Sequence, residues 1–78
     1  MRVKVKINTK DELNKFIDVC CKYHFDIDAC YGRYIVDAKS LLGMLSIGLE
    51  KKIDIVPYYD TDAHGEKLYR EIERWRVD

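Results

Sequence analysis

Ser40 is the side chain of this sequence best placed to do chemistry, because it stands at the expected start of a short helix, directly after Lys39. A serine in that position caps the helix and stabilises it by ~1 kcal/mol. A phosphoryl group on the same hydroxyl would be favoured by the free N–H groups and the positive dipole end of the helix. The sequence therefore leaves two interpretations open, a structural cap and a regulatory phosphorylation site.

The apolar residues that follow Ser40 also have two interpretations. They are the side chains of a helix that must bury something, or they form a surface that a protein partner contacts. The candidate partner-binding residues are Lys39, Leu41, Leu42, Met44, Leu45 and Ile47.

The two histidines offer little support for phosphoryl transfer or metal binding. His24 is expected where the first helix ends, and His64 in the first turn of the last helix. Asp60, Asp62 and Glu66 surround His64 and would repel a phosphate. Neither histidine has partners at the spacing of metal ligands, so structural roles and no metal site are predicted.

The remaining composition predicts a protein that is not an enzyme and needs no cofactor. The chain has three cysteines without a C-x-x-C pair, and no nucleophile–base pair or glycine-rich phosphate loop is present. Fourteen basic residues balance 14 acidic ones, which argues against nucleic-acid binding. The charged first residues do not resemble a signal peptide, and no apolar run reaches the ~18 residues of a membrane span. We therefore expect a cytoplasmic location with reduced thiols and no membrane association.

Hydrophobic periodicity predicts the elements of the first half of the chain. Alternation of apolar residues over 3–7 predicts a half-buried strand. Thr9 and Glu12 have the spacing of a capping box, and the helix that follows has an apolar face made by Leu13, Phe16, Ile17 and Cys20. Residues 25–29 and 34–36 predict two strands of a hairpin whose turn contains Gly32.

The second half of the chain predicts two helices and one strand. Ser40 and Gly48 bound a short helix over 41–46, and Pro57 ends a strand over 52–56. The cluster 60–62 begins a last helix, in which Gly65 weakens the first turn. Its buried stripe is expected to be Leu68, Ile72 and Trp75.

These elements predict one domain over residues 1–78 with the order β-α-β-β-α-β-α. Helices would cover one face of a four-stranded antiparallel sheet, which is an α+β arrangement. Two folds share this order, the HPr fold and ferredoxin-like sandwiches with an added helix.

The segment Lys39-Ser40-Leu41-Leu42-Gly43-Met44-Leu45-Ser46-Ile47-Gly48 resembles the regulatory-serine segment of HPr, the small phosphocarrier of the bacterial sugar phosphotransferase system. Lys22-Tyr23 before an aspartate-bearing strand and Gly32 in the turn before the third strand are also similar to HPr. The resemblance implies an HPr-like open-faced sandwich. It also implies that Ser40 corresponds to the serine that HPr kinase phosphorylates. The apolar residues around it would match the surface that contacts enzyme I, transporters, the kinase and a transcription regulator.

The junction between the first strand and the first helix departs from HPr. HPr carries a His-Ala-Arg-Pro sequence there, whose histidine accepts phosphate from enzyme I. Residues 7–13 contain no histidine, arginine or proline and offer Asp11 and Glu12 instead. In keeping the serine and lacking the histidine, the chain is similar to the catabolite-repression HPr-like protein.

The sequence therefore predicts a non-catalytic, regulatory or protein-binding module that acts through the Ser40 segment without phosphohistidine carrier activity. Two alternatives remain open. One is a phosphocarrier that uses His24 or His64. The other is a ferredoxin-like ligand-binding or RNA-binding domain, in which tyrosines such as Tyr58 and Tyr59 would stack on bases. The sequence makes no prediction of the oligomeric state.

Overall fold

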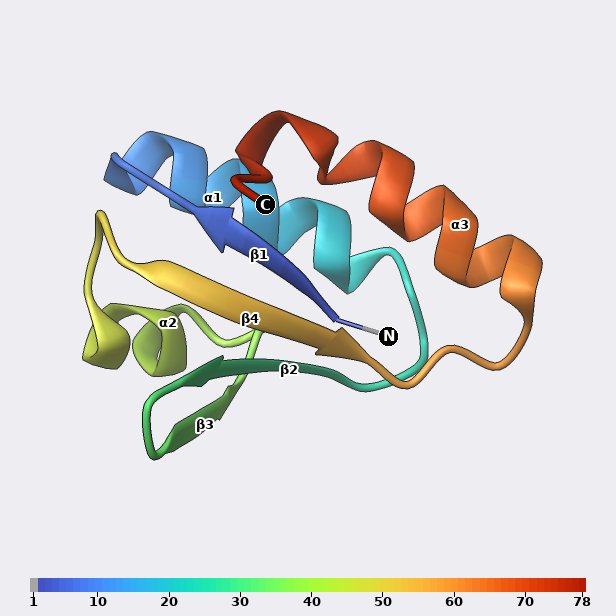
Figure 1. Cartoon of the computed structure of the whole chain (residues 1–78), viewed down its shortest axis with the longest axis horizontal. Coiled ribbons are helices and arrows are strands. Elements are labelled where there is room, and N and C mark those ends of the chain that lie inside the picture. The colour runs from blue at the N-terminus through green and yellow to red at the C-terminus, as the bar shows by residue number, and fades with distance from the viewer. Residues whose placement is uncertain (1) are drawn as a thin grey trace.

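The computed structural model describes residues 2–78, and its elements follow the predicted order (Figure 1). They are β1 (Val3–Lys6), α1 (Lys10–Cys21), β2 (Ile27–Tyr31), β3 (Tyr34–Asp37), α2 (Leu41–Ile47), β4 (Lys52–Pro57), α3 (Asp62–Glu71) and the 3₁₀ helix η1 (Glu73–Trp75). None of the helices in the described residues is long and apolar enough to cross a bilayer.

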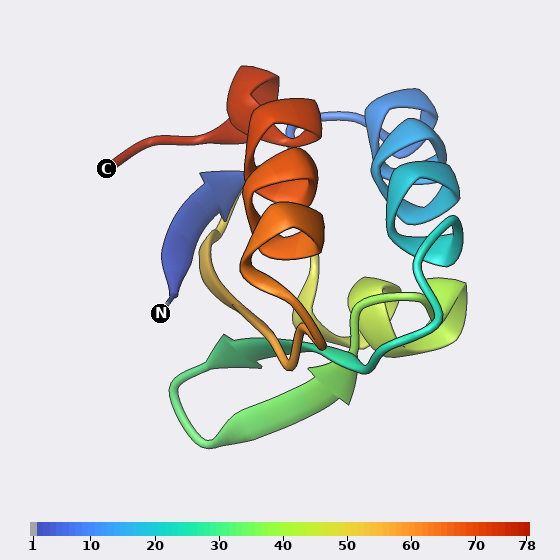
Figure 2. The ribbon, with the colours of Figure 1, turned by 90° about the vertical axis from the view of Figure 1, so that its right-hand side faces the viewer.

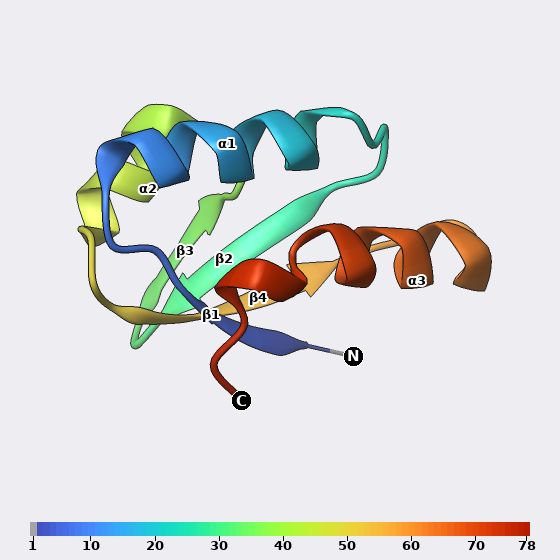
Figure 3. The same ribbon diagram turned by 90° about the horizontal axis from the view of Figure 1, so that it is seen from above.

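The strands form one sheet in the order β1-β4-β2-β3, and all three pairings are antiparallel. Neighbouring strands pair antiparallel in both folds that share this element order, so the strand order distinguishes them. The order found here, with β4 between β1 and β2 and β3 at the edge, is that of the HPr open-faced sandwich. The helices lie on one face of the sheet, with α1 beside α3 and α2 next to the end of β3 (Figures 2 and 3). The predicted α+β open-faced sandwich is confirmed.

The alternation of residues along the strands decides which face of the sheet is buried. Val3 and Val5 of β1 lie opposite Ile55 and Ile53 of β4, and all four side chains are at most 3% exposed. These side chains meet the apolar stripes of the helices, which form the core with them. Period-two patterning in a sheet covered on one face predicts this division.

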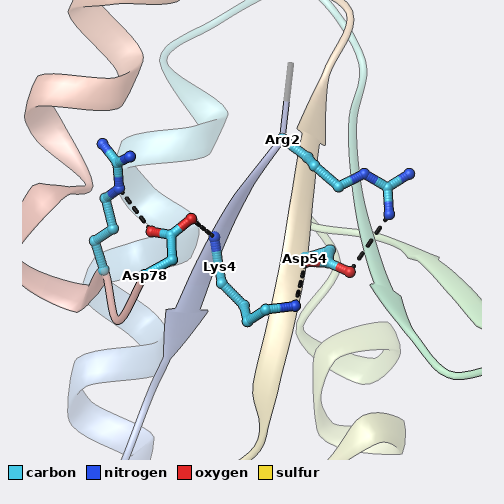
Figure 4. A network of polar contacts seen from close by, with 5 residues as sticks. Arg2, Lys4, Asp54 and Asp78 are labelled. Atoms are coloured by element: carbon cyan, nitrogen blue, oxygen red, sulfur yellow. Dashed lines mark hydrogen bonds and ion pairs between the residues drawn. The ribbon is translucent and has the colours of Figure 1, made fainter.

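The opposite face of the sheet is wet and charged. Asp54 accepts from Lys4 Nζ at 2.9 Å and from Arg2 at 3.4 Å (Figure 4). The same figure shows Asp78 at the outer edge of β1, where its carboxylate accepts from the backbone N of Lys4 at 3.2 Å. Ion pairs this exposed contribute little stability, so the core stabilises the sheet.

Several element boundaries differ from the predicted ones, most of them by one or two residues. β2 begins at Ile27 rather than at residue 25, because the carbonyl of Phe25 accepts from Lys39 Nζ at 2.8 Å instead of entering the ladder. β4 includes Pro57, which pairs in register with Ile27. α3 ends at Glu71, so the buried Ile72 and Trp75 lie in the cap and in η1 rather than in the helix.

Gly65 has a packing role that its helix propensity does not reveal. It is buried in α3, and a β-carbon at this position would lie 2.8 Å from the ring of Tyr59. Glycine lowers the helix propensity of the first turn, as predicted from the sequence, and its missing side chain lets the Tyr59 ring pack directly on the helix backbone.

Candidate functional site

Ser40 is the N-cap of α2, as predicted. Its backbone is extended, with φ −99° and ψ 118°, and its Oγ accepts a hydrogen bond from Gly43 N at 3.1 Å. Met44 N donates to Ser40 O at 2.9 Å and completes the first turn. The residue is half-buried, and its hydroxyl serves as the cap.

The far end of α2 is closed by Gly48, whose φ of 101° favours glycine. Its N–H donates to Met44 O at 3.2 Å. A short helix such as α2 depends on its caps and on packing, because so few intrahelical bonds cannot offset the cost of nucleation. Ser40 and Gly48 therefore position the leucines between them.

The structure separates the predicted partner-binding residues of α2 into two groups. Met44 and Ile47 face the core and are 2% and 8% exposed. Their burial makes them packing residues, and they cannot contact a partner unless α2 moves. Leu41 and Leu45 are each 38% exposed and Leu42 is 82% exposed. Leu42 therefore buries very little of its apolar surface in the chain. Together with the partly exposed Leu41 and Leu45 it forms the accessible part of α2, which we call the leucine surface.

Lys39 also differs from its predicted role. Its Nζ donates to Tyr23 O at 2.6 Å and to Phe25 O at 2.8 Å, both in the loop that follows α1. The side chain is half-buried and joins that loop to the start of α2. A direct contact with a partner or a phosphate would require the ammonium to leave these two carbonyls, so Lys39 acts here as a structural bridge.

The β1–α1 junction is a conventional helix start. Thr9 Oγ1 accepts from Glu12 N at 3.1 Å, which confirms the Thr9 half of the predicted capping box. The Glu12 carboxylate accepts from Arg74 at 2.8 Å, so it joins α1 to η1. The exposed Asp11 adds a second negative charge in the same turn. This junction offers a phosphoryl group carboxylates and no histidine.

The histidines lie together, which the sequence did not predict. His24 Nε2 is 2.9 Å from Asp60 Oδ2, and His64 Nδ1 is 2.7 Å from Asp60 Oδ1. The two imidazole rings are perpendicular, with centroids 6.1 Å apart. The hydrogen bond from His64 and the charges of both imidazoles hold the pKa of Asp60 below its usual value. The i, i+4 spacing of Asp60 and His64 was a readable signal, whereas the approach of His24 depends on the fold.

The Asp60 cluster does not have the arrangement of a metal centre. Both imidazoles point at the carboxylate rather than at a common point, and within residues 2–78 no group of three ligating side chains is placed to hold a metal ion. Nor do the described residues enclose a cavity for a small molecule.

The cysteines are all free thiols in different environments. Cys20 is fully buried and its pKa is raised to about 12 by that burial, so it is not a reactive thiolate. Cys21 is exposed and Cys30 is half-buried on the outer face of the sheet.

Comparison with known proteins identifies the fold. No family model and no curated protein matches the chain. Among solved structures, HPr-C-His from Thermoanaerobacter tengcongensis superposes with a TM-score of 0.73 and 18% identity, over 92% of this chain and 86% of that one. The phosphocarrier protein HPr from Bacillus anthracis superposes with a TM-score of 0.66 and 24% identity, over 91% of this chain and 94% of that one. With the predicted element order and the observed sheet topology, these superpositions show that the chain adopts the HPr fold.

Proposed function

We propose that this chain is a non-catalytic regulatory module that binds a protein partner through α2, with Ser40 as the site of a regulatory phosphorylation. The observation that carries the proposal is the exposure of the leucine surface directly after the half-buried cap serine. Leucine side chains left exposed together on one short helix cost solubility, and such a group is typical of a contact surface.

The partners that we propose follow from the fold and from the resemblance of residues 39–48 to HPr. They are proteins that contact HPr at the equivalent segment, namely HPr kinase, components of the phosphotransferase system and a transcription regulator, in the bacterial cytoplasm. The first turn of α1 carries Asp11 and Glu12 where HPr carries its histidine, so we propose that the chain does not carry phosphohistidine at that junction.

Phosphorylation of Ser40 would change the contact surface through charge. The hydroxyl lies one residue before Leu41 and caps the helix, so a phosphate there places about two negative charges beside the leucine surface. Such a charge weakens docking of an apolar or acidic partner and strengthens docking of a basic one.

The test is incubation of the purified chain with ATP and an HPr kinase, followed by mapping of phosphate by mass spectrometry. Stoichiometric phosphate on Ser40 supports the proposal. Ser46 is a matched control in the same helix, because its exposed hydroxyl donates to Gly43 O at 2.5 Å and does not cap the helix. The Ser46→Ala variant should still be phosphorylated and the Ser40→Ala variant should not. Absence of phosphate from a folded wild-type chain would contradict the regulatory role of Ser40.

One observation favours the alternative of a phosphocarrier with a different histidine. The contact of His64 Nδ1 with Asp60 leaves Nε2 as the nitrogen that would accept a phosphoryl group, and the same carboxylate orients His24. Acid-labile phosphate on His64 or His24 after incubation with phosphoenolpyruvate and enzyme I would establish this function. The Asp60→Asn variant should then lose most of the label.

A further inference from the structure

The two edges of the sheet are treated differently. The edge of β1 is covered by the C-terminal residues: Val5 forms a bridge with Arg76, and Val77 N donates to Lys4 O at 2.9 Å. Asp78 then accepts from Lys4 N (Figure 4). β3 forms the opposite edge. Among the residues that the structure describes, the one backbone hydrogen bond to an outward-facing group of β3 is from Ser40 N to Asp37 O, at 3.0 Å. An open edge of this kind is a template for another strand.

The register of the hairpin shows which backbone groups of β3 are available. Ala38 N donates to Ile27 O at 2.9 Å, in the same register as the β2–β3 pairs. Because hydrogen-bonded pairs alternate along an antiparallel ladder, Tyr34 and Val36 direct their N–H and C=O groups at β2. Ile35 therefore directs both of its groups at the open edge.

The side chains of β3 are unusually apolar for an uncovered strand. Ile35 is 68% exposed and Tyr34 is 61% exposed, although each could have been polar without affecting the core. Natural sheets protect open edges with charges, prolines or bulges. At this edge the charges occur only at the two ends of the segment, as Arg33 and Asp37.

Within residues 2–78, neither of these two end charges forms an ion pair. Arg33 is exposed in the turn and makes no ion pair within the described residues. Asp37 lies directly opposite Asp28 in the β2–β3 register, and like charges in that position destabilise a sheet. The Asp37 carboxylate accepts a hydrogen bond from the backbone N of Lys39 at 2.9 Å.

We propose that β3 pairs with β3 of a second copy of this chain, antiparallel and centred on Ile35. In this register Ile35 lies opposite Ile35 of the second copy and forms the hydrogen-bonded pair that its free groups require. Tyr34 lies opposite Val36 of the second copy. Arg33 lies opposite Asp37 of the second copy, and the twofold symmetry repeats that pair. The segment 33–37 is therefore self-complementary in charge and in apolar contact, as an isologous interface must be.

The interface joins two sheets into one but is small. Pairing along one four-residue strand buries much less than the ~1,200 Å² of a stable specific complex. The dimer should therefore be reversible, forming at high protein concentration and dissociating on dilution. This inference concerns β3 and does not depend on phosphorylation of Ser40.

Sedimentation velocity on the full chain tests the proposal, between ~20 µM and ~1 mM protein. The wild type should shift from monomer towards dimer as concentration rises. Arg33→Asp places two carboxylates in each end pair, and Asp37→Arg places two guanidinium groups there. Each single variant should associate at least ~10-fold more weakly than the wild type. An equimolar mixture of the two should recover dimerisation, because each copy then supplies the charge that the other needs.

Recovery on mixing separates this interface from a loss of folding, since a misfolded variant is not restored by another variant. Asp37→Arg also removes the bond to Lys39 N, so Ile35→Lys serves as a second variant that changes only the exposed face of β3. It should abolish the dimer and leave the circular dichroism spectrum unchanged. A wild type that stays monomeric at the highest concentration, or a mixture that does not recover, overturns the proposal. Binding of a different protein to β3 of a monomeric wild type would assign the open edge to that partner and overturn it as well.

Discussion

Replacement of Lys39 by methionine tests how the structure holds the Ser40 segment in place. Lys39→Met keeps the length of the side chain and removes the ammonium that donates to Tyr23 O and Phe25 O. The two hydrogen bonds, at 2.6 and 2.8 Å, join the loop after α1 to the residue before the α2 cap. We expect the variant to fold and to be less stable.

The magnitude follows from the two carbonyls. A hydrogen bond to a charged group contributes roughly 1.5–3 kcal/mol, and an unsatisfied buried acceptor costs a similar amount. Because Lys39 is half-buried, water can replace part of the loss, so we expect a total of about 2 kcal/mol. In a domain of this size that corresponds to a fall in Tm of ~8–16 °C.

Urea unfolding followed by circular dichroism measures the effect as a lower midpoint at an unchanged m value. Lys67→Met is the control, since Lys67 is exposed on α3 and makes no hydrogen bond within residues 2–78. It should change the free energy of unfolding by less than ~0.5 kcal/mol. Equal stabilities of Lys39→Met and wild type would refute the interpretation of Lys39 as a structural bridge.

Three further predictions concern the cap, the buried glycine and pH. Ser40→Ala should lower the free energy of unfolding by ~1 kcal/mol in urea, whereas Ser40→Asp, which still caps the helix, should stay within a few tenths of a kcal/mol of the wild type. Equal losses in the two variants would contradict the role of Ser40 as a cap. Gly65→Ala should cost ~1–3 kcal/mol, because the new methyl group meets the Tyr59 ring, and the cost should disappear when Tyr59 is also alanine. The hydrogen bond between Tyr23 and Glu71 raises the pKa of Tyr23, with burial the larger cause, and lowers the pKa of Glu71. The Glu71 contribution to the free energy of unfolding is therefore present above the unfolded pKa of a glutamate and is lost as pH falls through the lower folded pKa, whereas the Tyr23 contribution is lost as pH rises beyond the ordinary tyrosine pKa. The free energy of unfolding of Glu71→Gln should differ least from that of the wild type in acid, and a difference that is constant across pH would contradict this linkage.

Local sequence patterns predicted most of the fold because the relevant physics is local. Alternating residues in β1, the apolar stripe of α1 and the caps Thr9 and Ser40 each act within a few residues of their own position. The start of β2, which the alternation pattern misplaced, depends on a distant group. β2 begins two residues later than predicted because the Phe25 carbonyl accepts a hydrogen bond from Lys39, and hydrophobic periodicity does not encode such a contact.

The candidate site was predicted less completely, for a related reason. The leucine surface and the core residues of α2 form one apolar run in the sequence, and their separation depends on which side of a short helix faces the sheet. The Asp60 cluster was missed because His24 lies 36 residues before Asp60 and reaches it only through the fold. In the same way, the sequence showed Lys39 as an available cation because the two carbonyls that bind it belong to another loop.

The central claim is that α2 is the functional surface. Its most direct test is a titration of the isotope-labelled chain with HPr kinase, in which binding is measured by changes in the amide chemical shifts. The proposal predicts that the largest changes fall on residues 40–47 and that Leu42→Glu, a change at the most exposed position of α2, removes them without altering the rest of the spectrum. Changes centred on the Asp60 cluster, or an unchanged spectrum with a kinase that binds HPr, would contradict the assignment of α2 as the functional surface.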